Sequence, residues 1–123
     1  MSKLAGNSSR VLYELTLVLL KIRHSGEERW NAERVEGAIA LAARWGEKHN
    51  VPLLCDEFGV YRTFAPTTAR LRWIEDVRTA LERHGLGWTM WDYAGGFGVA
   101  VKKEGCATPD PQTIAALGLQ AAK

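Results

Sequence analysis

The sequence has little of what marks several large classes of protein. Its 123 residues include only two cysteines, Cys55 and Cys106, which lack the paired spacing of a zinc site or a disulfide framework. The spacing leaves undecided whether these two cysteines form a single disulfide with each other. The apolar run from Val11 to Leu20 is interrupted by Glu14 and is far shorter than the ~20 residues that span a bilayer. These absences exclude a disulfide-stapled domain and predict no membrane partner.

The sequence also has no large excess of charge of one sign. The 16 basic and 14 acidic residues give a formal net charge of +2, and their even spread predicts no nucleic-acid partner. No serine-histidine-aspartate order, phosphate-binding glycine loop or HExxH spacing occurs, so we expect no cofactor and no metal. His24, His49 and His84 are scattered, and the last two are interpreted as caps of helix ends rather than as ligands.

Residues 1–30 are expected to form a divergent leader and apolar segment. Lys3 and Arg10 are faintly similar to the basic start of a secretory signal, but no small-residue cleavage site follows. We therefore expect no usable signal, and the cellular location is left open. Residues 10–24 fit either a strand face or a helical stripe, and either one must be buried.

Residues 31–123 carry clear signals for the ends of helices. Asn31 is a predicted N-cap, Gly85 is a predicted C′ residue, and Asp110 with Pro111 is predicted to open the final helix. These signals and the apolar spacing predict a helix over 31–49, a strand over 52–59, a loop over 60–66 and a second helix that ends before Gly85. After it we expect a strand over 87–91 with a short extension over 97–101, a loop containing Gly105 and Pro109, and a last helix. Such alternation is typical of parallel strands joined by crossover helices, as in an α/β sheet or barrel.

Two adjacent carboxylates end the first of these strands. Asp56 and Glu57 should point to opposite faces of an extended strand, so only one can line a pocket there. If Leu53, Cys55 and Glu57 share a face, Glu57 emerges at the carboxyl end, where barrel enzymes place reacting groups. The alternative is a carboxylate bonded to loop amides or to an arginine.

The second strand contains Trp88 and Trp91, which also point to opposite faces if the strand is regular. Trp91 lies nearer to the end that carries the carboxylate. Because sugar rings present flat C–H faces that pack on indole, an aromatic residue beside a carboxylate suggests carbohydrate binding. The alternative is ordinary packing in the core or at its rim.

Several motifs together resemble glycoside hydrolase family 5, the cellulase family. The resemblance extends from about Trp30 to Leu117, and it is carried by Trp45, Val51-Pro52-Leu53-Leu54-Cys55-Asp56-Glu57-Phe58-Gly59-Val60, Arg72-Trp73-Ile74, Gly87-Trp88-Thr89-Met90-Trp91-Asp92-Tyr93 and Phe97-Gly98. It implies half of a (β/α)8 barrel in which the two strands are the seventh and the eighth. It also implies that Glu57 is the catalytic nucleophile and that Trp91 lines the sugar subsite at the cleavage point.

Other parts of the family pattern are absent. The family carries its acid/base glutamate in an Asn-Glu-Pro strand end, and no Asn-Glu-Pro occurs here. Residues 13–18 align loosely with the family's sixth strand and residues 24–26 with its following His-Gln-Gly loop. In that alignment Thr16 and Val18 replace an active-site histidine and tyrosine.

These departures predict a truncated, vestigial hydrolase portion that is inactive alone. Whether the protein is an enzyme in any assembled form is left open. An open part-barrel exposes one strand face and two strand edges, so we expect a homo-oligomer that buries residues 11–22. One alternative is an oligomeric β-glucanase whose acid comes from Glu14, Asp92 or another copy's Glu57. A second is a non-catalytic domain that binds carbohydrate, such as a β-glucan, or another protein.

Overall fold

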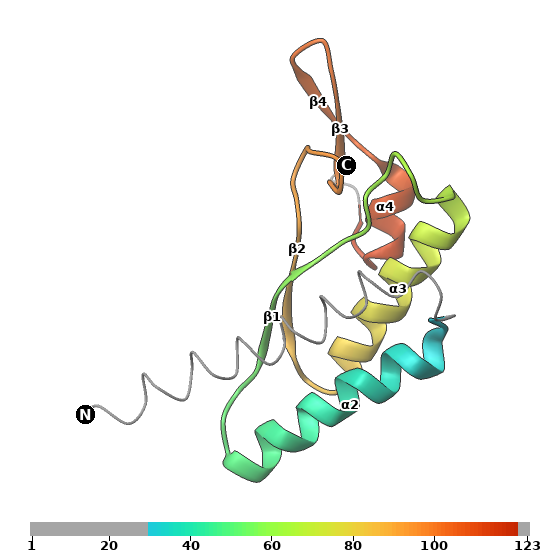
Figure 1. The fold of residues 1–123 in the computed structure, drawn as a ribbon. Helices are drawn as coiled ribbons and strands as arrows, with labels where there is room; N and C mark the ends of the chain where they lie inside the picture. Colours follow the sequence, from blue (N-terminus) through green and yellow to red (C-terminus); the bar gives the residue numbers. More distant parts are fainter. Residues whose placement is uncertain (1–29, 121–123) are drawn as a thin grey trace, which may run out of the picture.

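The computed structural model describes residues 30–120, which form a small α/β unit (Figure 1). The elements are α2 (Ala32–His49), β1 (Leu54–Phe58), α3 (Thr67–Arg83), β2 (Gly87–Met90), β3 (Ala100–Lys103), β4 (Cys106–Pro109) and α4 (Pro111–Ala116). β1 and β2 form a parallel pair joined by α3, and β3 and β4 form a separate antiparallel pair. The predicted alternation of helix and parallel strand is therefore confirmed. Apart from Trp30, the expectations for residues 1–30, including both alternatives for 10–24, lie outside the described residues.

The ends of all three helices follow the signals in the sequence. The Asn31 side chain accepts a hydrogen bond from the backbone N–H of Arg34 at 3.0 Å, and Asn50 ends α2 in the left-handed conformation. Gly85, with φ of +69°, follows the last residues of α3, a conformation that glycine adopts without steric cost. Asp110 caps α4, with Pro111 in its first turn.

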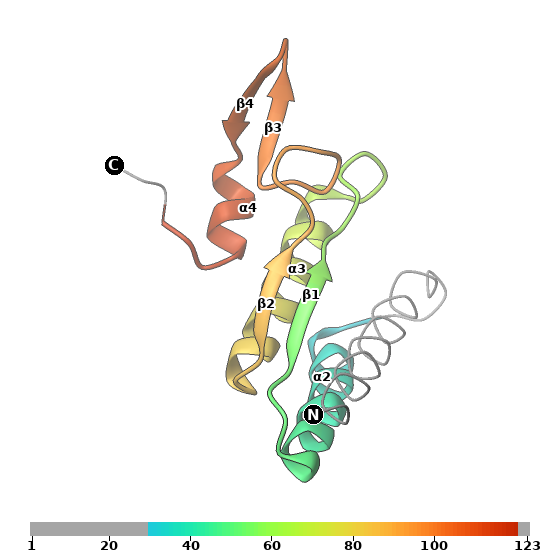
Figure 2. The same ribbon diagram turned by 90° about the vertical axis from the view of Figure 1, so that its left-hand side faces the viewer.

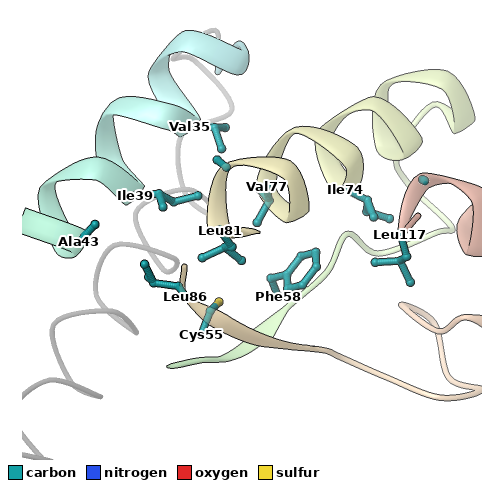
Figure 3. Close-up of a cluster of buried hydrophobic side chains, with 12 residues drawn as sticks. Val35, Ile39, Ala43, Cys55, Phe58, Ile74, Val77, Leu81, Leu86 and Leu117 are labelled. Atoms are coloured by element: carbon teal, nitrogen blue, oxygen red, sulfur yellow. The ribbon is translucent and has the colours of Figure 1, made fainter. Parts of the chain in front are cut away.

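The hydrophobic core lies between the helices and one face of the parallel pair, as Figure 3 shows. Val35 and Ile39 of α2 and Ile74 and Leu81 of α3 are at most 5% exposed, and their spacing places them on one face of each helix. Both views of the ribbon place α2 and α3 on the same side of β1 and β2 (Figures 1 and 2). Leu54 of β1, in contrast, is 45% exposed.

The region after β2 differs from the prediction. The loop expected around Gly105 is a hairpin of β3 and β4 that projects from the rest of the fold (Figure 2). Lys103 pairs with Cys106 across the turn, and Glu104 and Gly105 have φ of 48° and 85°. Positive φ at both central residues is typical of a type I′ turn, whose twist matches that of the paired strands. The short extension begins at Ala100 instead of Phe97.

The cysteines and histidines of the described region have other surroundings than expected. Cys55 is buried and Cys106 is exposed, and both are free thiols, so the disulfide that was left open is not formed. The imidazole of His84 pairs with the Glu36 carboxylate of α2 at 2.7 Å, and the ring of His49 lies 4.4 Å from that of Trp45. His84 is the C-cap residue of α3, where its backbone N–H donates to the carbonyl oxygen of Ala80, and His49 is the last residue of α2. Their rings do not make the expected bonds to helix-end carbonyls within the described residues, because each ring has a partner on a helix face.

The described residues show neither a metal-binding cluster nor a membrane-spanning helix. Residues 30–120 contain no group of three or more histidine, cysteine or acidic side chains placed to hold a metal ion. None of the helices in that range has the length and apolar character needed to cross a membrane.

Candidate functional site

Glu57 and Trp91 lie at the carboxyl ends of two adjacent parallel strands. The backbone N–H of Trp91 donates to the carbonyl oxygen of Phe58 at 2.9 Å, which extends the pairing of β1 and β2 past Met90. The hydroxyl of Thr89 donates to the carbonyl oxygen of Asp56. Because parallel strands end at the same edge of their sheet, these bonds place the two residues at one edge.

Gly59 allows the chain after Glu57 to approach Trp91 closely. A Cβ atom at Gly59 would lie 2.3 Å from the carbonyl oxygen of Trp91 and 3.4 Å from the side chain of Phe97. Only a residue without a side chain fits at that separation. The glycine of the Glu-Phe-Gly motif therefore sets how closely the two strand ends meet.

The end of β1 is less regular than the sequence predicted. The pairing register shifts between Cys55 and Phe58, and both of these residues are buried, at 1% and 3% exposure. Asp56 and Glu57, which lie between them, are both exposed. The expectation that Glu57 shares the face of Cys55 is wrong, because the irregular register turns Phe58 into the core instead.

The alternative interpretation of the carboxylates finds no support in residues 30–120. The ion pairs of this part of the chain join other acidic residues to its arginines and to His84, and none involves Glu57. Within the described region the Glu57 side chain also accepts no hydrogen bond from a loop amide. Among residues 30–120, Glu57 is therefore an exposed carboxylate without an ion-pair or hydrogen-bond partner.

The two tryptophans of the second strand have different surroundings. Trp88 is half-buried, packs edge-on against Phe58 at 5.6 Å between ring centroids, and donates its indole N–H to Glu82 at 3.3 Å. Trp91 is 53% exposed. Trp88 thus belongs to the rim of the core, whereas Trp91, directly after the strand, is half-exposed.

Asp92, the acidic residue that follows Trp91, forms hydrogen bonds within its own loop. Its Oδ1 accepts the backbone N–H of Gly95 at 2.8 Å, and a Cβ at Gly95 would lie 2.0 Å from its Oδ2. Its carbonyl oxygen accepts the backbone N–H of Val99 at 3.1 Å. The peptide bond between Trp91 and Asp92 is cis. Asp92 therefore shapes the loop after β2.

Further aromatic side chains, to which the sequence analysis assigned no role in the site, follow the ends of the two strands. Tyr61 and Phe64 follow β1, and Tyr93 and Phe97 follow β2. Tyr61 lies 5.1 Å from Phe97 and 5.5 Å from Phe64 between ring centroids. Their position directly after the two strand ends was the signal that could have identified them.

A partly buried charge cluster connects the loops that follow the two strands. Arg62 donates to the Asp110 carboxylate at 2.6 Å and to the carbonyl oxygen of Gly98 at 2.7 Å. Arg70 and the Thr113 hydroxyl donate to the same carboxylate oxygen at 3.1 Å and 2.6 Å, and Arg70 also contacts Thr113. The cluster ties both loops to α3 and α4.

Burial and charge determine the protonation of this cluster. Burial alone would raise the pKa of Asp110, but hydrogen bonds from Thr113 and Arg62 outweigh it and lower the pKa to about 2. Burial and the neighbouring charge of Arg62 lower the pKa of Arg70. Because Arg70 is only 2% exposed, its charge depends on Asp110 for compensation.

Comparison with known proteins points to endoglucanases. No family model matches the chain. Endoglucanase 3 of Fibrobacter succinogenes is 30% identical over 67 residues, which are 54% of this chain and 10% of that protein. A hyperthermophilic endo-β-1,4-glucanase solved in complex with substrate has a TM-score of 0.63 and 30% identity, over 74% of this chain and 29% of that one.

A further solved structure agrees with these two. The endoglucanase Cel5A of Thermotoga maritima has a TM-score of 0.63 and 26% identity, over 70% of this chain and 27% of that one. The chain thus spans less than a third of the length of the proteins it matches. The chain corresponds to a portion of a cellulase-like domain, and it matches part of the barrel of the family 5 endoglucanases over about 30% of their length.

Proposed function

We propose that this chain carries the nucleophile side of a retaining β-glucanase site and that, by itself, it binds β-glucan without cleaving it. The observation that carries the proposal is the position of Glu57 and Trp91 at the ends of paired parallel strands, joined by the bond from Trp91 to Phe58. In this proposal β1 and β2 are the seventh and eighth strands of a (β/α)8 barrel. The carboxyl ends of such strands form the active-site face of barrel enzymes.

The chemistry assigned to Glu57 is attack of a carboxylate oxygen on the anomeric carbon of a glucose unit. A carbon–oxygen bond forms to the enzyme, and the bond to the leaving sugar breaks. Retaining cleavage also needs a second carboxyl group ~5 Å away to protonate the leaving oxygen and later to activate water. Among residues 30–120, Asp92 is engaged with the Gly95 amide and Asp56 is the immediate chain neighbour of Glu57. Because residues 30–120 offer no free second carboxyl group at this edge other than the immediate neighbour of Glu57, and no Asn-Glu-Pro occurs in the sequence, we expect the isolated chain to be inactive.

The proposed ligand is a β-1,4-linked glucan. One support is Trp91, whose half-exposed indole offers a flat apolar face to the C–H face of a sugar. The other is the similarity to a protein described as an endo-β-1,4-glucanase in complex with its substrate. The Glu57 carboxylate adds a hydrogen-bond acceptor for sugar hydroxyls at the same edge.

The experiment is a reducing-sugar assay on a soluble β-1,4-glucan, with the unaltered chain and the Glu57→Gln chain in parallel. We expect no release of reducing ends by either chain. A rate in the unaltered chain that Glu57→Gln abolishes would show that assembly supplies a second carboxyl group, and it would refute the proposed inactivity. A rate that survives Glu57→Gln would refute the role of Glu57.

Carbohydrate binding without any catalytic role is a second candidate, and the exposed aromatic residues at the strand ends favour it. Trp91 and Tyr93 are 53% and 69% exposed. On this interpretation Trp91→Ala abolishes oligosaccharide binding, whereas Glu57→Gln and Glu57→Ala leave the affinity unchanged. Calorimetric titration with cellobiose compares these variants directly.

We also propose that copies of this chain associate through the parallel pair of strands. The supporting observation is Leu54, which is 45% exposed on β1, in a described sheet of only two strands. Strand edges and apolar sheet faces left open to water favour pairing with another chain. Light scattering at micromolar concentrations is expected to give a mass above that of one chain, and a stable monomer would refute this proposal.

A further inference from the structure

Arg62, in the loop between β1 and α3, makes three hydrogen bonds to residues outside its own loop. Its backbone N–H donates to the carbonyl oxygen of Gly96 at 2.8 Å. Its guanidinium donates through Nη2 to the carbonyl oxygen of Gly98 at 2.7 Å and through Nη1 to the Asp110 carboxylate at 2.6 Å. One residue thus joins the loop after β1 to two points of the loop after β2.

Gly98 is packed closely against the two residues that follow Trp91. It is buried, and a Cβ atom there would lie 2.6 Å from the carbonyl oxygen of Tyr93 and 2.8 Å from Oδ1 of Asp92. The next residue, Val99, donates its backbone N–H to the carbonyl oxygen of Asp92 at 3.1 Å. Because the interior is close-packed, a displacement of Gly98 is transmitted to the peptide that follows Trp91.

The two strand ends depend on Arg62 to different degrees. Glu57 lies between Cys55 and Phe58, which are 1% and 3% exposed, so the core holds this end of β1. Trp91 is joined to β1 by the bond from its N–H to the carbonyl oxygen of Phe58, but its own side chain is 53% exposed. The position of Trp91 therefore depends on the loop that follows it more than the position of Glu57 does.

The geometry of this bridge suits arginine and not lysine. A guanidinium carries N–H donors on two branches of one plane, so it bonds the Asp110 carboxylate with one branch and the Gly98 carbonyl oxygen with the other. A lysine ammonium is a single point charge at the end of a flexible stem. Arg70 also donates to the Asp110 carboxylate, at 3.1 Å, so that carboxylate keeps a charged partner when Arg62 is replaced. The effect of replacing Arg62 by lysine is therefore expected mainly at Gly98.

We propose that Arg62 is a positioning residue: through Gly98 it holds the peptide that follows Trp91 and thereby fixes the place of Trp91 at the end of β2. The inference rests on the proposed function, because it names a residue on which glucan binding at this edge depends. Arg62 itself acts through Trp91 and does not contact the sugar. Contact groups need such support, since a displacement of about 1 Å can cost about a hundredfold in the function they serve.

The first measurement is nuclear magnetic resonance on the isotope-labelled 123-residue chain, without any ligand. In Arg62→Lys and Arg62→Met, we expect the amide hydrogen exchange of Val99 to rise about tenfold or more, as the loss of one charged hydrogen bond predicts. The indole N–H signal of Trp91 should shift in both variants. The amides in the middle of α2 should keep their protection, because the opening is local.

The second measurement is calorimetric titration with cellobiose, beside urea unfolding. We expect Arg62→Lys to weaken binding about three- to tenfold, which is at most the loss of the Trp91 contact itself. In the Trp91→Ala chain, adding Arg62→Lys should weaken binding no further, because Arg62 acts through Trp91. Arg78→Lys, at an arginine that pairs with Glu82 within α3, is the matched control. It should change neither the Trp91 signal nor the affinity, and its urea midpoint should be close to that of Arg62→Lys.

The possible results separate this inference from the proposed function. If Arg62→Lys leaves the Val99 exchange and the Trp91 signal unchanged while Trp91→Ala weakens cellobiose, the inference is overturned and the proposed function stands. If the α2 amides exchange as much faster as Val99 does, Arg62 contributes only to global stability, and the inference is overturned as well. A full additive loss in the double variant would show that Arg62 does not act through Trp91. If the unaltered chain binds no cellobiose, the proposed function is refuted, and the Val99 exchange with the Trp91 signal alone decides whether Arg62 holds this peptide.

Discussion

Substitution of Asp110 by asparagine is the sharpest test of how the two loops are held at the strand ends. Asparagine keeps the size of the side chain but removes the charge that Arg62 and Arg70 share. A pKa of about 2 against an ordinary 3.8 corresponds to about 2 kcal/mol of stability at neutral pH. Loss of the carboxylate also leaves the Arg70 side chain, at 1% exposure, as a buried charge without compensation.

The magnitude follows from burial of the cluster. Removing one member of a buried ion pair costs about 3–5 kcal/mol, and the 12% exposure of Asp110 with the 30% exposure of Arg62 places this case near the lower end. We therefore expect Asp110→Asn to lower the free energy of unfolding by about 3 kcal/mol, which is a large part of a typical 5–15 kcal/mol. With an m-value of about 1.5–2 kcal/mol/M, the urea midpoint falls by about 1.5–2 M.

Urea unfolding followed by circular dichroism and tryptophan fluorescence measures this change. Glu82→Gln is the matched control, because it removes a surface pair with Arg78 and should cost less than about 1 kcal/mol. Adding Arg70→Met to Asp110→Asn removes the buried charge as well and should recover part of the loss. If Asp110→Asn costs no more than Glu82→Gln, the reasoning about the cluster is refuted.

Three further predictions follow from the described geometry. Because the pKa of Asp110 is lowered in the folded state, the stability that its carboxylate contributes is complete above about pH 4 and is lost as the pH falls toward about 2. The urea midpoint of the unaltered chain should therefore fall with pH across this window, and that of Asp110→Asn should fall less. Gly59→Ala should destabilise the fold by about 1–3 kcal/mol, since its Cβ would lie 2.3 Å from the Trp91 carbonyl oxygen. Gly37→Ala in α2, where a Cβ meets nothing within 4 Å, should stabilise the fold by about 0.5–1 kcal/mol. Equal urea midpoints for the two variants would contradict this. Burial raises the pKa of the Cys55 thiol to about 11, so a thiol reagent at neutral pH should modify Cys106 quickly and Cys55 only after unfolding in urea; equal rates in the folded chain would disprove the burial of Cys55.

Local signals were sufficient to predict the helices and the parallel strands. Asn31, Gly85 and Asp110 each act within a few residues of their own position, so the sequence alone identifies the helix ends that they set. The resemblance to family 5 was carried by residues around Glu57 and Trp91, and the comparisons support it.

Features that depend on distant residues could not be predicted in the same way. The register shift between Cys55 and Phe58 depends on which side chain fills the core beneath α3. The cluster joins Arg62, Arg70 and Asp110, up to 48 residues apart along the chain, and no periodic pattern connects them. The β3–β4 hairpin has mostly exposed residues, so it lacks the alternation by which strands are predicted.

Covalent trapping of the nucleophile tests the central proposal most directly. A 2-fluoro-β-cellobioside with a dinitrophenolate leaving group needs no acid, because the phenolate departs with the bonding electron pair without protonation. Attack by the Glu57 carboxylate then forms a glycosyl ester on that residue, which intact mass spectrometry and peptide mapping detect. We expect one fluorocellobiosyl group on Glu57 and none on the Glu57→Gln chain. An unlabelled chain, or a label on another residue, would contradict the assignment of Glu57 as the nucleophile.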